Sequence, residues 1–408
     1  MKTHRIQFPN RKGIKLSANL DLPLGERPQA YAILAHCFTC SKNFKGEKNI
    51  SLALTQNKIA VLRFDFTGLG ESEGEFFDTN FSSNVSDLLD GARFLAENHE
   101  APQLLVGHSL GGAAVLMAGS QIESVKAIAT VGAPSEPEHV KHLFAAVEDR
   151  IHQDGEAKVE IAGRPFTIRK QFLEDIESVK LEDVIANLDR ALLVMHSPQD
   201  QVVAVDNARK IYEAARHPKS FLTLDGADHL LLNKPDSLYA GHMIATWATR
   251  YLDLEEKEPL ITDRQAVVRV GETGYTSEVR TGKHEFLADE PASVGGDDLG
   301  PSPYDLLLAS LGACTAMTLR MYADRKKWPL KEVRVHLEHY KDYPEDQGHV
   351  DEKASKIDYI DRQIEIEGDL DEKQLQRLME IADRCPVHRT LHSEIKVKTV
   401  LEARNGSD

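Results

Sequence analysis

Short apolar runs alternate with amphipathic stretches over residues 30–250. The runs are short and apolar enough for buried strands, and they occupy residues 30–36, 59–64, 103–107, 126–131, 191–196 and 219–224. Between two of them, residues 85–96 place apolar side chains at i, i+3, i+4 and i+7, the spacing of a helix with one face on a sheet. This alternation predicts an α/β fold, a mostly parallel sheet with flanking helices.

The alternation stops at residues 135–188, where a charged insertion contains a hairpin-like segment at 158–168. We interpret this insertion as a small lid. Residues 254–259 form a polar stretch closed by Pro259, a composition typical of a linker, which we place at residues 256–261. We therefore expect one domain over residues 1–255 and a second over residues 262–408.

The second domain has a different order of elements. Its pattern predicts strands at 266–270, 275–279 and 284–287, a long apolar helix at 306–322, strands at 333–339 and 358–367, and a second helix. Strands and helices in this order are typical of an α+β domain. The chain therefore reads as a fusion of two unrelated units, each with its own candidate chemistry.

Composition limits the kinds of partner and the cellular compartment that we expect. With 49 Lys and Arg against 65 Asp and Glu, the formal charge is −16, which opposes binding to nucleic acid. No apolar run approaches the length of about 18 residues that a membrane span needs, and the chain starts in a strand-like stretch. We expect a cytoplasmic protein that binds neither nucleic acid nor membrane and needs no cofactor or metal ion. Four cysteines are too few for a disulfide scaffold.

A G-x-S-x-G pentapeptide occupies residues 107–111, with Ser109 at its centre. It follows a predicted strand and opens an apolar helix, the context in which such a serine lies on a sharp turn. The flanking glycines relieve crowding there, and the helix amides favour an oxyanion. By itself the motif also fits a glycine-rich turn whose serine caps a helix. The partners of Ser109 therefore decide its role.

A nucleophilic serine needs a histidine base and a carboxylate that orients the histidine. Asp200 follows the predicted strand 191–196, and His229 follows the strand that ends at 224, so both lie where sites collect in open α/β sheets. Asp206 and Asp228 are alternatives to Asp200, but Asp206 is expected to cap the helix 207–215 and Asp228 directly precedes the histidine.

These motifs resemble those of α/β-hydrolase-fold serine hydrolases, over residues 10–253. The resemblance implies a Ser109–His229–Asp200 triad and an oxyanion hole made by the backbone amides of Leu110 and Phe38. The remaining histidines near the predicted strand tips are interpreted as turn or core residues: His36, His108 and His196.

Three further features bear on the first domain. Cys37 and Cys40 have the spacing of a redox pair, but they lie in a loop, so two unreactive cysteines are favoured. The charged lid argues against long lipid substrates, because lipase lids present an apolar face. We therefore expect small soluble esters as substrates.

Two distant cysteines mark the second domain. Cys314 lies inside the long apolar helix, where simple packing is the ordinary role of a cysteine. Cys385 ends the second helix and precedes Pro386, which suits the first position of a new helix. A thiol at a helix N-terminus has a lowered pKa and is a competent attacking or resolving group.

Residues 303–314 and 385–391 resemble the corresponding motifs of the OsmC and organic-hydroperoxide-resistance family of thiol peroxidases. The resemblance implies that Cys314 attacks a peroxide, that Cys385 resolves the sulfenic acid as a disulfide, and that the domain forms intertwined homodimers. It also implies a supporting role for Asp305, which equally fits a helix cap. The expected arginine is absent from the stretch around Tyr275, so Arg269 or Arg280 is the candidate substitute.

Two enzyme classes follow from these motifs. The first is a serine carboxylesterase acting on small, short-acyl esters. The alternative is chiefly a thiol peroxidase acting on organic hydroperoxides with a thiol reductant. In a third interpretation the OsmC-like half serves only as a dimerisation scaffold.

Overall fold

The computed structural model describes the chain except for residues 26, 162, 255–257, 273, 343–356 and 403–408. It divides into two compact units, Met1–Pro259 and Leu260–Asp408. The division falls within residues 256–261, the stretch interpreted as a linker, part of which lies outside the described residues. Each unit is described by itself.

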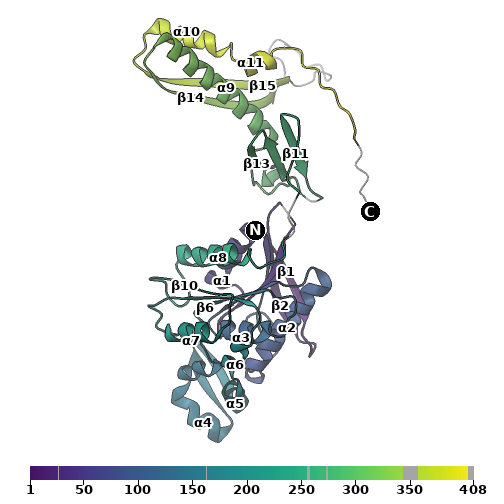
Figure 1. The fold of residues 1–408 in the computed structure, drawn as a ribbon, viewed down its shortest axis with the longest axis vertical. Coiled ribbons are helices and arrows are strands. Elements are labelled where there is room, and N and C mark those ends of the chain that lie inside the picture. Colours follow the sequence, from purple (N-terminus) through teal and green to yellow (C-terminus); the bar gives the residue numbers. More distant parts are fainter. Residues whose placement is uncertain (26, 162, 255–257, 273, 343–356, 403–408) are drawn as a thin grey trace. The chain divides into compact units, whose positions relative to one another are not determined.

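The first unit is built on one large sheet (Figure 1). Among the described residues it has eight strands in the order β1-β2-β4-β3-β5-β6-β9-β10. The pairs β1·β2 and β2·β4 are antiparallel and the others are parallel. The strand bounds are Lys2–Pro9, Lys15–Leu22, Ile59–Phe64, Ala30–Ala35, Leu104–His108, Ala127–Val131, Ala191–His196 and Lys219–Thr223, in sheet order.

Helices cover both faces of this sheet, as the α/β pattern predicts. Side chains of α1 (Lys45–Gln56) and α8 (Lys234–Ala248) share one core with the strands. Side chains of α2 (Phe81–Asn98), α3 (Leu110–Gly119) and α7 (Asp206–Ala214) belong to the core on the other face. The central strands β3 to β6 and β9 are buried along their whole length, which explains why the sequence shows continuous apolar runs there.

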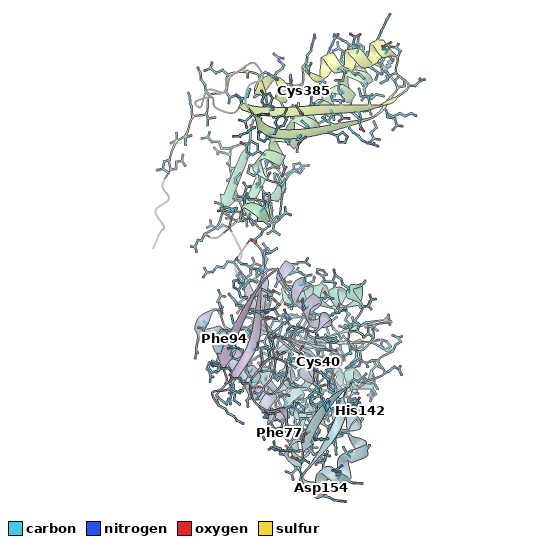
Figure 2. All side chains as sticks on the ribbon, turned by 180° about the vertical axis from the view of Figure 1, so that it is seen from behind. Cys40, Phe77, Phe94, His142, Asp154 and Cys385 are labelled. Carbon is cyan, nitrogen blue, oxygen red and sulfur yellow. A yellow bond between two sulfur atoms is a disulfide. The ribbon has the colours of Figure 1, made fainter. Side chains whose placement is uncertain are left out.

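The insertion between β6 and β9 forms a small layer whose buried side chains join the core on one face of the sheet. It contains the short helices η2 (Pro137–Leu143), η3 (Ala145–Val147), α4 (Glu148–Asp154), α5 (Lys170–Ser178) and α6 (Leu181–Ala186), and the hairpin β7 (Glu156–Ile161) and β8 (Arg164–Arg169). In Figure 1, α4 and α5 lie together at the lower end of the unit, and Figure 2 labels His142 and Asp154 in this insertion.

The lid buries an aromatic face, contrary to the expectation drawn from its charge. Phe144 and Phe172 are almost fully buried. The Phe172 ring centroid lies 5.6 Å from that of Phe38, and Phe166 lies 4.9 Å from Phe76 of η1 (Phe76–Asp78). The charges occupy the outer side, because an amphipathic element keeps charged groups in water. The argument from charge against an apolar lid face was therefore wrong.

The second unit is α+β, as predicted. Three antiparallel strands, β11 (Ala266–Val270), β12 (Ser277–Thr281) and β13 (His284–Ala288), precede the short helix η4 (Ala292–Val294). The long helix α9 (Pro303–Lys326) then packs on the antiparallel hairpin of β14 (Leu330–Asp342) and β15 (Ile357–Gly368). Helices α10 (Glu372–Ala382) and α11 (Pro386–Leu391) follow. Strand β12 begins two residues later than predicted, and Tyr275 is exposed.

Helix α9 bears on the expectation that no segment of the chain is apolar enough to span a membrane. By length and composition it could cross a membrane, although no uninterrupted apolar run suggested this. In the structure Leu319 of α9 is fully buried and shares a small core with Leu378 and Ala382 of α10. The helix therefore serves as a packing element of this unit.

Candidate active site

Ser109 lies on the sharp turn between β5 and α3. Its backbone angles are φ 54° and ψ −126°, a conformation that residues other than glycine rarely adopt. The Ser109 amide donates to the Val131 carbonyl at 2.9 Å. A Cβ atom on Gly111 would lie 2.5 Å from the carbonyl oxygen of His36, so only glycine fits there. The turn is therefore a strained nucleophile elbow held by its neighbours.

Three of the predicted residues form a continuous hydrogen-bonded relay. The Oγ of Ser109 lies 3.0 Å from Nε2 of His229, and Nδ1 of His229 lies 2.7 Å from Oδ2 of Asp200. Because a carboxylate only accepts, Nδ1 carries the hydrogen, which leaves Nε2 free to accept from the serine hydroxyl. The other carboxylate oxygen of Asp200 accepts from the amides of Val202 and Val203, at 2.8 and 2.9 Å. The relay can therefore move a proton off Ser109.

The environment keeps the base neutral and the acid ionised. Burial raises the pKa of Asp200, but hydrogen bonds from His229 and from the Val203 amide lower it by more, so the net shift of this pKa is downward. Burial lowers the pKa of His229; the Asp200 hydrogen bond opposes this, and the nearby His108 adds to the lowering. At neutral pH, His229 is thus ready to accept a proton.

The alternative carboxylates face elsewhere. Asp206 is the first residue of α7 and pairs with Arg209 at 2.8 Å, while Val205 occupies the cap position. The expectation that Asp206 caps this helix was therefore wrong. Asp228 accepts from the amides of Leu230 and Leu232, at 2.9 and 3.1 Å, and so shapes the loop that carries the histidine. Of the three acids, the structure brings Asp200 to His229.

The expected oxyanion donors lie at the start of α3 and in the loop after β3. Leu110 is the first residue of α3, where backbone N–H groups have no partner within the helix. Phe38 lies in the loop after β3. The Thr39 carbonyl in this loop accepts a hydrogen bond from Arg164 of the lid, and the Lys42 amide donates to Asp65 at 2.6 Å.

Cys37 and Cys40 form a disulfide across the Phe38 loop. The sequence favoured two unreactive cysteines over a redox pair, and the structure joins the two in a bond. The Cys40 amide also donates to the Cys37 carbonyl at 3.1 Å, so the four residues make a closed turn. The pair spacing was visible in the sequence, but a loop position alone does not tell a bonded pair from a free one.

The cysteines of the second unit are both free. Cys314 is partly exposed on α9, whereas Cys385 is buried and caps α11, where its Sγ accepts from the His388 amide at 3.3 Å (Figure 2). Thr315, next to Cys314 in the chain, lies 3.6 Å from the same sulfur. The helix-terminal position predicted for Cys385 is therefore present.

Arg362 of β15 contacts residues that lie beside Cys385. It donates to Thr315 at 3.1 Å and to the Ala382 carbonyl at 3.2 Å, and it pairs with Asp383. The candidates proposed from the sequence are held elsewhere: Arg269 bonds Glu278, and Arg280 bonds the Leu260 carbonyl. Sequence reasoning missed Arg362 because it searched only the first hairpin, not the alternating inward positions of 358–367.

Asp305 completes a capping box with Ser302, accepting from its amide and hydroxyl at 2.9 and 2.7 Å. These hydrogen bonds lower the pKa of Asp305. A cavity of about 550 Å³ lies nearby and is lined by both Arg362 and His388. The structure thus gives Asp305 the helix-cap role.

Two groups of side chains have a spacing that could hold a metal ion among the described residues. One comprises Cys37, Glu47 and His108, but Cys37 is already in the disulfide. The other comprises Glu148, His152 and Glu177, where Lys141 lies 2.8 Å from Glu148 and 2.7 Å from Glu177.

Comparison with known proteins connects each unit to a family. The family model described as serine aminopeptidase, S33, matches residues 27–181, and the one described as OsmC-like protein matches residues 295–400. The solved esterase domain of a Rhodothermus marinus protein is 50% identical, with 62% of this chain and 99% of that domain covered and a TM-score of 0.52. Est1E of Butyrivibrio proteoclasticus, solved with ferulic acid, shares the fold at 19% identity, 60% and 98% coverage and a TM-score of 0.51.

Two curated proteins also match part of the chain. The mitochondrial palmitoyl-protein thioesterase ABHD10 of Rattus norvegicus is 31% identical over 120 residues, which are 29% of this chain and 39% of that protein. The uncharacterized protein YfhR of Escherichia coli K12 is 20% identical over 229 residues, covering 55% of this chain and 72% of its own.

Proposed function

Because the chain belongs to the α/β-hydrolase esterases through its first unit and joins that unit to an OsmC-like one, we propose that it is a serine carboxylesterase. The observation that carries the proposal is the hydrogen-bonded relay from Ser109 through His229 to Asp200 at a strained elbow. No other group of described residues in this unit combines a nucleophile, a base and an orienting acid in this way.

The reaction proceeds by acyl transfer. The Oγ of Ser109 attacks the ester carbonyl while Nε2 of His229 takes its proton, and Asp200 stabilises the imidazolium that forms. The backbone amides of Leu110 and Phe38 receive the oxyanion of the tetrahedral intermediate. His229 returns the proton to the departing alcohol and then activates water to hydrolyse the acyl-serine.

The proposal of small acyl groups is supported by the crowding of apolar side chains beside the elbow. Phe38 and Leu110 line a cavity of only about 10 Å³ there. The lid crowds the same region, because the Phe172 ring centroid lies 5.6 Å from that of Phe38. We propose acetyl to butyryl esters as the substrate class.

The test is hydrolysis of p-nitrophenyl acetate and butyrate by the full chain, beside Ser109→Ala and Cys314→Ser. The proposal expects loss in the serine variant and wild-type rates in the cysteine variant. Equal rates in the serine variant and the wild type would refute it. Loss in the cysteine variant alone would assign the hydrolysis to the second unit.

A second activity is favoured by the position of Cys385, buried at the start of α11 beside the Thr315–Arg362 pair. In this proposal the Cys314 thiolate attacks a hydroperoxide, releasing an alcohol and leaving a sulfenic acid. The Cys385 thiol condenses with that acid, forming a disulfide and releasing water, and a thiol reductant restores both cysteines. Peroxide treatment should then yield a Cys314–Cys385 disulfide by mass spectrometry, and its absence would favour a scaffold role.

A homodimer through the second unit fits the exposed apolar side chains of α9. Met317 and Met321 are 64% and 72% exposed on this helix. Apolar side chains gathered on one helix are commonly covered by a partner. Sedimentation of the full chain beside Met317→Lys would test this, because a charge at that position should shift the equilibrium to monomers.

A further inference from the structure

Two buried ionisable residues close to the relay have no part in the mechanism above. His108 precedes the nucleophile at the end of β5 and is 3% exposed, and Glu47 of α1 is 1% exposed. The Nδ1 of His108 lies 3.1 Å from Oε1 of Glu47, and its Nε2 lies 2.7 Å from the backbone carbonyl oxygen of His229. The pair thus connects α1 to the backbone of the base.

The chemistry of these contacts determines where the hydrogens lie. A carbonyl oxygen only accepts, so Nε2 of His108 carries a hydrogen. If His108 were then neutral, its Nδ1 lone pair would face the Glu47 carboxylate, which is unfavourable in a buried site. One further proton must lie between Nδ1 and Oε1, which makes the pair an imidazolium and a carboxylate, or their neutral forms.

The surroundings favour the imidazolium form. Burial lowers the pKa of His108, but the hydrogen bond and charge of Glu47 more than offset this, and the net shift is upward. The second oxygen of Glu47 is buried without a hydrogen-bond partner among the described residues. The carboxylate therefore depends on His108 for its stabilisation.

Building on the proposed function, we propose that Glu47 and His108 are positioning residues, which together fix the backbone of His229 and keep its imidazole unprotonated. The proposal rests on the two contacts of His108 and on the burial of the pair. It assigns no contact with substrate to either residue.

The first part of the effect is mechanical. His229 lies in the loop between β10 and α8, where Leu231 has φ 51°, and Asp228 organises the following turn. The hydrogen bond from His108 ties the carbonyl of His229 to the end of β5, the strand that leads directly into Ser109. Nucleophile and base are thereby anchored to the same strand, which limits the variation of the distance between them.

The second part is electrostatic. The ring centroids of His108 and His229 are 5.3 Å apart, so a cation at His108 opposes a second cation at His229. The ionisable groups acting on His229 are Asp200, His108 and His196; those acting on His108 include Glu47 and Asp200. Among these, Asp200 favours the charged form of His229, whereas His108 and His196 oppose it.

The variant Glu47→Gln removes the charges of the pair while it retains the hydrogen bonds of His108. The glutamine amide can donate to Nδ1 of a neutral His108 while Nε2–H still donates to the His229 carbonyl, so both hydrogen bonds are retained. With the cation removed, the acid limb of kcat/KM should move upward by about one pH unit. The plateau at high pH should change by less than about threefold. Glu97→Gln, an exposed change on α2, is the matched control and should reproduce the wild-type profile.

The double variant Glu47→Leu/His108→Leu tests the mechanical part. Replacing a buried pair by apolar residues of similar size usually preserves folding. The variant should keep its melting temperature and lose about tenfold in kcat, because the His229 carbonyl has lost its anchor. Wild-type kcat in a folded double variant would overturn this part.

A fluorophosphonate reagent distinguishes failure of the inference from failure of the proposed function. Its rate of labelling Ser109, followed by peptide mass spectrometry, reports the basicity of His229 without ester turnover. A wild type unlabelled at Ser109 would refute the esterase mechanism. Suppose that labelling of the wild type has a sigmoidal pH dependence and that Glu47→Gln has the same midpoint. The inference then fails while the esterase mechanism stands, even if the variant is labelled more slowly at every pH. A midpoint raised by about one pH unit supports it.

Discussion

Replacing Asp200 by asparagine should disable the base without disturbing its position. One oxygen of Asp200 accepts from the amides of Val202 and Val203, and only an oxygen can do so. The asparagine oxygen must therefore keep that place, which turns its NH₂ group toward Nδ1 of His229. A donor there requires Nδ1 to accept, so the hydrogen moves to Nε2. The imidazole then cannot take the proton of Ser109.

The size of this effect follows from the loss of the productive tautomer. Trapping a triad histidine in the wrong tautomer costs about 10⁴-fold in kcat. This corresponds to about 5 kcal/mol of transition-state stabilisation. Binding of substrate does not use Asp200, so KM should change by less than about threefold.

Stopped-flow hydrolysis of p-nitrophenyl acetate at pH 7 measures both constants. Asp206→Asn is the matched control, because Asp206 is an exposed acid at the start of α7 and pairs with Arg209. Asp200→Asn retaining more than about a tenth of wild-type kcat would refute the tautomer argument. An equal loss of kcat in Asp206→Asn would show that the orienting role does not belong to Asp200 alone.

Further outcomes follow from the same geometry. Activity should fall as the pH drops through the pKa of His229, which lies below its ordinary 6.5, so an acid limb of kcat/KM centred above 6.5 would contradict the account. Gly111→Ala should give insoluble or unfolded protein, since its Cβ would lie 2.5 Å from a backbone oxygen; a folded variant by circular dichroism would count against the elbow geometry. Cys40→Ser should lower the free energy of unfolding by about 2 kcal/mol in urea titrations, because a short cross-link is lost, and unchanged stability would show that the bond contributes nothing.

Apolar strands and spacing motifs were the features most accessible to sequence reasoning. The runs at 59–64 and 191–196 became β4 and β9 with unchanged bounds, because fully buried parallel strands are apolar throughout. The order of serine, acid and histidine could be predicted because each follows a strand whose carboxyl end meets the same sheet edge.

What composition could not reveal was the direction in which side chains point. The lid is rich in charge, yet Phe144 and Phe172 turn inward, since a few aromatic residues suffice to cover one face. Arg362 of β15 reaches the Ala382 carbonyl at the end of α10, and His108 of β5 reaches Glu47 of α1. Such contacts depend on the packing of α1, β5, α10 and β15, which no local pattern specifies.

Trapping the acyl-enzyme tests the central claim most directly. The full chain would be mixed with p-nitrophenyl acetate, quenched in acid within milliseconds, digested and examined by peptide mass spectrometry, with Ser109→Ala treated in parallel. The account predicts one added acetyl group on Ser109 in the wild type and none on that peptide in the variant. Acetyl on Cys314 or Cys385 instead, or turnover with Ser109 unmodified, would contradict it.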